Sequence, residues 1–312
     1  AAGNAWVNKL NSSFIAFNRN KKSLSVNLKT EKGREAVYRL VEKADVLLQN
    51  FRPGVAERLG LDYETIRGVN DKIVYCSISG YGETGPYAKR PGQDLILQGY
   101  SGAMWNTGKE GDPPLPLGMF VADATAAHQA VEGILAALFY RERSGKGQKV
   151  EISMLNCVMD LQAQELSVYL TGGVKPKRTK EPLAHTLLNS PYGVYKTKDG
   201  YMTLAFGPIH LLGEALDNDR LRSFTEWKDG MEHRDEIYRI VAEILPQKTT
   251  QEWIEILDQY NLWAGPVYTY DDLVNDPQVH HNQMIVEIDH PTEGKLKVLG
   301  IPIRFSESPG TI

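Results

Sequence analysis

The chain has 312 residues, of which 42% are hydrophobic and 24% are charged, and its formal net charge is −4 at pH 7. This length allows one large or two medium globular domains. The charge balance excludes a bulk basic field of the kind that attracts nucleic acid or an anionic membrane. Any phosphate binding must therefore come from local lysine and arginine clusters.

The two cysteines, Cys76 and Cys157, have neither metal-ligand nor redox-motif spacing. Both lie in apolar stretches, so we expect buried free thiols in a reducing cytoplasm. No apolar run reaches the roughly 18 residues needed to cross a bilayer, and the sequence shows no signal peptide. No cluster of metal-ligating residues is seen, so no metal is expected.

Strand and helix patterns alternate in the first part of the chain. Strands are predicted over 24–28, 45–49 and 73–79, and helices over 32–43, with Thr30 as its cap, and over 63–68. This alternation predicts an α/β fold with a parallel, doubly wound sheet. Ligands of such sheets bind beyond the carboxyl ends of the strands. The loops at 50–54 and 80–86 both fall at such ends.

The strongest helical pattern covers 124–143, and its basic residues near the C-terminal end suit the helix dipole. A strand at 150–153 and a second long helix at 154–170 are predicted next. Residues 171–191 are rich in Pro, Lys and Gly, which is typical of a linker.

A smaller α+β pattern follows this linker. Two strands at 193–197 and 201–205 are joined around Lys198-Asp-Gly200, which indicates a hairpin. Helices are predicted over 235–245 and 250–260. The segment 264–268 and strands near Ile285 and Ile301 are expected to carry the chain back.

Asp123 lies where an apolar run ends and the 124–143 helical pattern begins. Two roles are open for it. An Asp before a helix commonly caps the first free N–H groups, and the local sequence favours this role. A carboxylate flanked by small residues is also open to a thioester, as a nucleophile, and the same helix N-terminus would hold negative charge during acyl transfer.

A series of short motifs runs in order along nearly the whole chain. They are FNRNKK (17–22), NLKT (27–30), GR (33–34), AD (44–45), NFRPG (50–54), RLG (58–60), SGYG (79–82), TGP (84–86), RPG (90–92) before Asp94, AD (122–123), GKGQ (145–148), AGPV (264–267), DP (276–277), HP (290–291) and GIP (300–302). In this order they resemble the class III coenzyme A transferases, the CaiB/BaiF family.

The resemblance implies a CoA-transferase family III fold in an interlocked homodimer. Residues 1–190, with 263–312 returning, would form a large Rossmann-like CoA-binding domain with a parallel sheet. Residues 193–262 would form a small α+β domain, reached through a linker at 171–192. The family pattern begins with a further β-α unit that helps hold CoA. The sequence starts after this unit, so we expect a truncated chain in which part of the CoA site cannot be assigned.

The resemblance also assigns the catalytic residues. Asp123 falls on the nucleophilic aspartate of the family, and Asp94 on an acidic position that lines the active site. Asp94 would orient or electrostatically tune the acyl group, with a helix cap as its alternative role. His185 is expected to approach the acyl site, whereas a packed or capped role is expected for His128.

CoA carries a 3′-phosphate and a diphosphate, so its pocket needs cations and backbone N–H groups. By resemblance, Lys29 and Arg58 contact CoA, Asn50 and Phe51 lie along the nucleotide, and Val26 packs nearby. The alternative role for the two cations is that of solvated surface charges.

The implied reaction moves CoA from an acyl-CoA donor to a free carboxylic acid. Asp123 attacks the donor thioester, which gives an acyl–aspartyl anhydride and CoA thiolate. The thiolate then forms an aspartyl-CoA thioester and releases the donor acid. The acceptor carboxylate attacks that thioester, and CoA resolves the second anhydride. Such chemistry needs a carboxylate nucleophile, oxyanion donors and exclusion of water.

Two alternatives stay open. The α-methylacyl-CoA racemases share this fold but need two opposed bases. Their pattern has a His before the Asp at 94 and a Glu in the small-domain strand, where this chain has Gln93 and Gly207. Both differences argue against an isomerase. The other alternative is a non-catalytic CoA-binding subunit, which would have no need of Asp123. The sequence does not identify the donor and acceptor acids.

Overall fold

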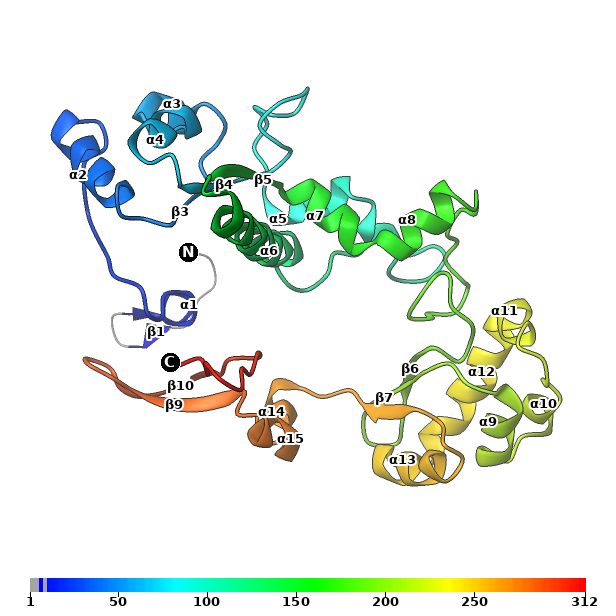
Figure 1. Cartoon of the computed structure of the whole chain (residues 1–312). Helices are drawn as coiled ribbons and strands as arrows, with labels where there is room; N and C mark the ends of the chain where they lie inside the picture. The colour runs from blue at the N-terminus through cyan, green and yellow to red at the C-terminus, as the bar shows by residue number, and fades with distance from the viewer. Residues whose placement is uncertain (1–5, 8–9) are drawn as a thin grey trace. The chain divides into compact units, whose positions relative to one another are not determined.

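The computed structural model describes residues 6–7 and 10–312 (Figure 1). The described residues fall into two compact units. One unit is formed by 26–266, and the other joins the described residues up to 25 with 267–312. None of the helices that the structure describes combines the length and the hydrophobicity of a membrane span.

A parallel three-stranded sheet forms the centre of the first half of the larger unit. Its strands are β3 (Val46–Gln49), β4 (Val74–Ser79) and β5 (Gln148–Ser153), in the order β3-β4-β5. Parallel pairing requires crossover connections, and helices supply them. The predicted mixed α/β fold with a parallel sheet is therefore confirmed.

Helices lie on both sides of this sheet (Figure 1). α3 (Val55–Leu59) and α4 (Tyr63–Val69) connect β3 to β4, and the long α6 (Val121–Ser144) lies on the other side. A Cβ at Gly133 would lie 2.7 Å from Val150 Cγ1, so α6 can approach β5 this closely only at a glycine.

Several predicted elements are confirmed. α2 (Glu31–Val41) begins at the predicted cap, because Thr30 Oγ1 accepts a hydrogen bond from the Gly33 N–H at 3.2 Å. Cys76 and Cys157 are buried free thiols, as expected.

Other elements differ from the prediction. Residues 24–28 form no strand, because Asn27 instead forms a turn in which its side chain accepts from the Lys29 N–H at 3.1 Å. The long helix predicted over 154–170 is two helices, α7 (Met154–Leu161) and α8 (Ala163–Leu170). They break at Gln162, whose side-chain amide donates to Ser101 O at 3.2 Å.

The second half of the larger unit contains an antiparallel sheet with helices on one face. Its strands are β6 (Gly193–Lys196), β7 (Tyr201–Leu204) and β8 (Ala264–Pro266), in that order. Alternate residues of β6 and β7 are buried, which is the pattern of a sheet covered on one side. The predicted hairpin is confirmed.

The helices of this half include both that were predicted, α12 and α13. Their bounds are α9 (Ile209–Ala215), α10 (Asp219–Arg222), α11 (Asp229–Glu232), α12 (Arg234–Ile244) and α13 (Thr250–Gln259). One apolar cluster joins α9, α10, α12 and α13 to the sheet, with Met202, Ile237 and Leu257 fully enclosed. The domain boundaries at 190 and 193–262 stay predictions.

The smaller unit brings the two ends of the chain together. It contains β1 (Trp6–Val7), β2 (Leu10–Asn11), α1 (Ser12–Phe17), α14 (Tyr270–Leu273), α15 (Pro277–His281), β9 (Ile285–His290) and β10 (Gly294–Leu299). β9 and β10 form an antiparallel hairpin. Asn20 Nδ2 donates to Thr311 O at 3.1 Å, which links the N-terminal and C-terminal segments.

Candidate active site

Asp123 lies in the first turn of α6, but it does not cap that helix. Phe120 is the N-cap residue and makes no side-chain cap bond. The capping carboxylate is Asp94, the first residue of α5 (Asp94–Tyr100). Its Oδ1 accepts from the N–H of Ala122 at 2.6 Å and from that of Asp123 at 3.2 Å. The local interpretation of Asp123 as an N-cap is therefore wrong, and Asp94 has that role for α6.

All of the first four N–H groups of α6 have acceptors. Those of Ala122 and Asp123 point to Asp94, while Val121 N donates to Met119 O and Ala124 N to Phe120 O, each at 3.0 Å. The expectation that this helix N-terminus supplies oxyanion donors is consequently not supported, because these donors are already used. A developing oxyanion needs donors from another segment.

The carboxylates of Asp94 and Asp123 lie in different environments. Asp94 is only 4% exposed, and Gln98 Nε2 donates to its Oδ2 at 2.6 Å. The Asp123 side chain is exposed at the surface, although its carboxylate is partly desolvated. This desolvation raises the pKa of Asp123, and the negative charge of Asp94 raises it further.

A close approach of two glycines positions α5 at the end of β4. A Cβ on Gly80 would lie 2.8 Å from Gly92 Cα, and one on Gly92 would lie 2.7 Å from Gly80 Cα. Gly80 O also accepts from Leu155 N at 3.0 Å. The Gly-rich loop after β4 thus lies between α5 and α7, and this fixes where Asp94 enters its helix.

An aromatic cluster adds to this contact. Tyr81, Tyr87 and Tyr100 meet pairwise edge to face, with ring centroids 5.5–5.8 Å apart. The Arg90 guanidinium lies 4.3 Å from the Tyr87 ring centroid and donates to Tyr100 Oη at 2.9 Å. The cluster therefore packs the segment before Asp94 against Tyr100, the last residue of α5.

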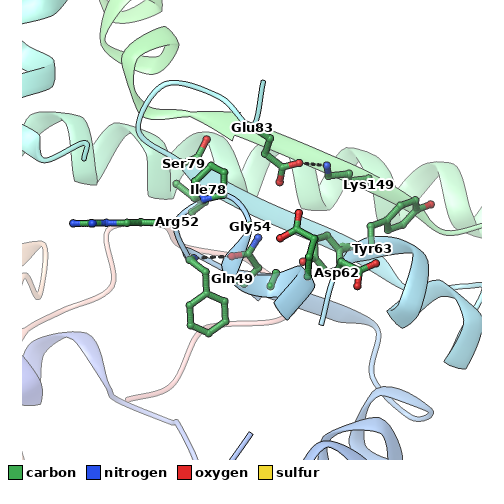
Figure 2. Close-up of a pocket in the computed structure, with 14 residues that line it drawn as sticks. Gln49, Arg52, Gly54, Asp62, Tyr63, Ile78, Ser79, Glu83 and Lys149 are labelled. Carbon is green, nitrogen blue, oxygen red and sulfur yellow. Dashed lines mark hydrogen bonds and ion pairs between the residues drawn. The ribbon is translucent and has the colours of Figure 1, made fainter. Parts of the chain in front are cut away.

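A small polar cavity opens at the carboxyl ends of β3 and β4 (Figure 2). Asn50 and Phe51 follow β3 directly. Asn50 Nδ2 donates to Ile78 O at 2.7 Å, and the Phe51 N–H donates to Gln49 Oε1 at 2.6 Å. These bonds hold the 50–54 loop against the end of β4, which is where the sequence places a ligand loop.

The charges around this cavity do not suit a phosphate. Glu57, Asp62 and Glu83 line it, together with Arg52 and Lys149. Lys149 is paired with Glu83, and Figure 2 shows Arg52 extending away from the carboxylates. Burial alone would lower the pKa of Lys149, but its bond to Glu83 and nearby negative charge raise it overall. CoA phosphates would therefore lie outside this cavity.

Two exposed cations are Arg58, in the last turn of α3, and Lys29, just before α2. Arg58 is in the last turn of α3, and its Nη1 would lie 3.5 Å from a Cβ on Gly54. The structure thus brings Arg58 to the loop that carries Asn50 and Phe51. Lys29 lies with Val26 in the turn before α2, and among the described residues no hydrogen bond links that turn to the 50–54 loop.

No ion pair or hydrogen bond with another described residue involves the Lys29 ammonium or the Arg58 guanidinium. Both cations are therefore available to an anionic ligand. Among the same residues, no group of three or more His, Cys, Asp or Glu side chains could hold a metal ion.

The model of CoA-transferase family III matches residues 2–312 of this chain. The chain belongs to CoA-transferase family III. A CaiB/BaiF family protein from Brucella suis has a similar crystal structure, with a TM-score of 0.81 and 33% identity over 95% of this chain and 78% of that one. The resemblance found in the motifs is confirmed.

Two relatives of this chain have names that state a CoA-transferase activity. A mouse protein named succinyl-CoA:glutarate CoA-transferase is 33% identical over 98% of this chain and 71% of its own length. A Streptomyces avermitilis protein named formyl-CoA:oxalate CoA-transferase is 30% identical over 95% of this chain and 77% of its own length. The family III chain is accordingly an enzyme of the CoA-transferase class, whose members use CoA thioesters as co-substrates.

The structure describes both residues that the sequence analysis weighed against an isomerase. Gln93 is the N-cap residue of α5 and makes no side-chain cap bond, and Gly207 lies between β7 and α9. Both ring nitrogens of His185 have partners: its Nε2 lies 2.7 Å from Glu165 Oε1, and its Nδ1 accepts from Leu187 N at 3.1 Å. His128 is exposed on α6.

Sequence reasoning missed Gln98, which contacts Asp94 from within the same helix. Gln98 and Asp94 are four residues apart, a spacing that places both on one helix face. The signal was hidden because α5 has only seven residues and was not predicted as a helix.

Proposed function

We propose that this CoA-transferase moves CoA from an acyl-CoA donor to a free carboxylic acid, with Asp123 as the nucleophile. One observation carries the proposal: Asp94 caps α6, and this leaves the Asp123 carboxylate without a hydrogen bond to any other described residue. A carboxylate that is free of structural bonds, and whose pKa is raised by desolvation and by a neighbouring charge, is a candidate nucleophile.

The proposed reaction has four covalent steps. An oxygen of Asp123 attacks the donor thioester carbonyl, the C–S bond breaks, and CoA leaves as a thiolate. The thiolate attacks the aspartyl carbonyl of the anhydride, which gives aspartyl-CoA and the donor carboxylate. The acceptor carboxylate then displaces CoA thiolate from the aspartyl group. Finally the thiolate attacks the acceptor carbonyl, which frees the Asp123 carboxylate and the new acyl-CoA.

Asp94 is proposed to act beside the nucleophile in two ways. Its bonds to the N–H groups of Ala122 and Asp123 fix the first turn of α6, so the direction of the Asp123 side chain is set. Its negative charge also raises the pKa of Asp123, which makes that carboxylate a stronger base and a better nucleophile once ionised.

CoA binding is proposed along the 50–54 loop that follows β3, with the CoA phosphates outside the acidic cavity. Asn50 and Phe51 would lie along the nucleotide, with Val26 packing beside it, and Lys29 and Arg58 would neutralise phosphates. The support is positional: Arg58 lies over the 50–54 loop, and the two cations have no partner among the described residues. Arg58 provides the bidentate donors that phosphate oxygens favour.

The proposed assembly is an interlocked homodimer of chains with a Rossmann-like domain (1–190 with 263–312) and a small domain (193–262). Its support is a row of exposed apolar side chains on α6. Val131, Leu135 and Phe139 are 55%, 59% and 66% exposed, and they are spaced one helical turn apart. A cytoplasmic location, in keeping with the two free thiols, is part of the same proposal.

A panel of free acids tests this function. The protein is incubated with acetyl-CoA or succinyl-CoA and with each acid in turn, and new CoA thioesters are detected by mass. A new thioester that needs both donor and acceptor supports the transferase. CoA binding without exchange for any acid would favour a non-catalytic CoA-binding subunit. Deuterium uptake at the α-carbon of a 2-methylacyl-CoA in deuterium oxide would instead favour an isomerase.

A further inference from the structure

Gln98 is a buried amide whose polar atoms are all engaged. The residue lies in α5 and is only 2% exposed. Its Oε1 accepts from Leu117 N at 2.9 Å, and its Nε2 donates to Met119 O at 3.2 Å and to Asp94 Oδ2 at 2.6 Å. A buried amide with this many partners links separate segments of a protein.

The backbone partners fix which way the amide faces. A backbone N–H can only donate, so the atom facing Leu117 N must be the amide oxygen. A backbone carbonyl can only accept, so the atom facing Met119 O must be the amide nitrogen. The same nitrogen faces Asp94 Oδ2, so Gln98 donates an N–H to the carboxylate.

Through these bonds Gln98 contacts both the segment that leads into α6 and the carboxylate that caps this helix. Leu117 and Met119 belong to the segment that leads into α6, while Asp94 accepts from the first N–H groups of that helix. Asp94 thus receives three N–H donors, from Gln98, Ala122 and Asp123. All three are N–H groups that donate to the oxygens of this carboxylate.

We propose that Gln98 is a positioning residue for CoA transfer. It keeps the Asp94 carboxylate turned to the α6 N–H groups and holds the entering segment in place, so the Asp123 carboxylate keeps the direction needed to attack a thioester. This inference rests on the proposed function of Asp123. Because Asp94, and not Asp123, caps α6, the first turn of this helix stays capped while Asp123 is acylated and uncharged.

Two variants and one control separate positioning from general stability. Gln98→Leu keeps the approximate volume but removes every side-chain hydrogen bond. Gln98→Glu keeps the shape but faces Asp94 with a second carboxylate, which can donate only when protonated. Ser101→Ala is the control, because the Ser101 hydroxyl is also buried in this segment but bonds only to backbone groups: it donates to Gln98 O at 2.9 Å and accepts from Ala103 N at 3.3 Å.

The first readout is turnover, well below the unfolding temperature of each variant. Gln98→Leu should lower kcat on the order of 10- to 100-fold, the cost of a misplaced reacting group, with the dissociation constant for acyl-CoA unchanged. The ratio of Gln98→Glu kcat to wild-type kcat should rise as the pH falls, because the introduced carboxyl group can again donate to Asp94 once it is protonated. Ser101→Ala should keep wild-type kcat.

The second readout does not depend on turnover. Hydrogen–deuterium exchange of a peptide covering 117–124 should lose protection in Gln98→Leu and keep it in Ser101→Ala. Wild-type kcat in Gln98→Leu, or unchanged protection of this peptide, would overturn the proposal. A wild-type protein that exchanges CoA with no acid would refute the proposed function instead, and the exchange data would still decide whether Gln98 positions this turn.

Discussion

Asp94 Oδ1 lies 3.2 Å from the backbone nitrogen of Asp123, so one aspartate caps the helix that carries the other. The two carboxylates therefore have different environments at one helix N-terminus. Asp94 is buried and receives N–H donors, whereas the Asp123 carboxylate is exposed and feels the charge of Asp94. Environments of this kind separate the roles of paired acidic groups, with one bonded to backbone N–H groups and the other free to react.

Asp123→Asn should bind acyl-CoA normally but lose turnover by at least about 1,000-fold, because an amide cannot form the anhydride. Borohydride or hydroxylamine trapping during turnover should mark Asp123 in the wild-type protein. Glu132→Gln is the matched control, since Glu132 is exposed on the same helix. Near-normal exchange of CoA by Asp123→Asn would remove Asp123 from the mechanism.

Asp94→Asn should change both the pH profile and the stability. The charge of Asp94 raises the pKa of Asp123, so its removal should move the acid limb of kcat/KM to lower pH. An asparagine also turns an amide toward Gln98 Nε2 or toward the α6 N–H groups, where two donors would meet. We expect a loss of about 1–3 kcal/mol in the free energy of unfolding. An acid limb that stays in place would show that Asp94 does not tune Asp123.

The raised pKa of Asp123 has a consequence for stability. The folded protein holds this proton to higher pH than the unfolded chain does, so the contribution of Asp123 to stability falls as the pH rises from 3.8 through the raised pKa. Above that range the ionised carboxylate destabilises the fold. Asp123→Asn should therefore unfold at a higher temperature than wild type near pH 7. The difference should disappear at pH values below 3.8.

The sequence predicted the elements whose signals are local. Thr30 precedes an amphipathic pattern and caps α2, and the apolar run at 73–79 is β4. The cap of α6 could not be read in this way, because Asp94 lies 28 residues before Ala122, and a tertiary contact decides the role of each aspartate. The motif order located the candidate site, but the bonds of Gln98 depend on the loop at 117–119, which has no periodic pattern.

Gly92→Ala should disturb the site without touching either aspartate. The new Cβ would lie 2.7 Å from Gly80 Cα, a backbone atom that cannot move without shifting the end of β4 or the start of α5. We expect a loss of about 1–3 kcal/mol in unfolding free energy, together with reduced turnover. Gly118→Ala is the control, because a Cβ there meets no atom within 4 Å. Equal stability of the two variants in chemical denaturation would contradict the close approach.

Arg58→Ala should weaken CoA binding about 10- to 100-fold, which corresponds to one charge-assisted hydrogen-bonding group. Arg58 lies over the 50–54 loop and has no partner among the described residues, so its loss should leave the fold unchanged. Arg67→Ala is a matched control, because Arg67 is likewise an exposed arginine in the last turn of a short helix, α4.

Isothermal titration with CoA and with 3′-dephospho-CoA measures the effect of Arg58→Ala. If Arg58 contacts the 3′-phosphate, the variant should bind the two ligands equally, whereas wild type prefers CoA. A loss of affinity that is the same for both ligands would place Arg58 on the diphosphate, and unchanged affinity for both would exclude Arg58 from the CoA site.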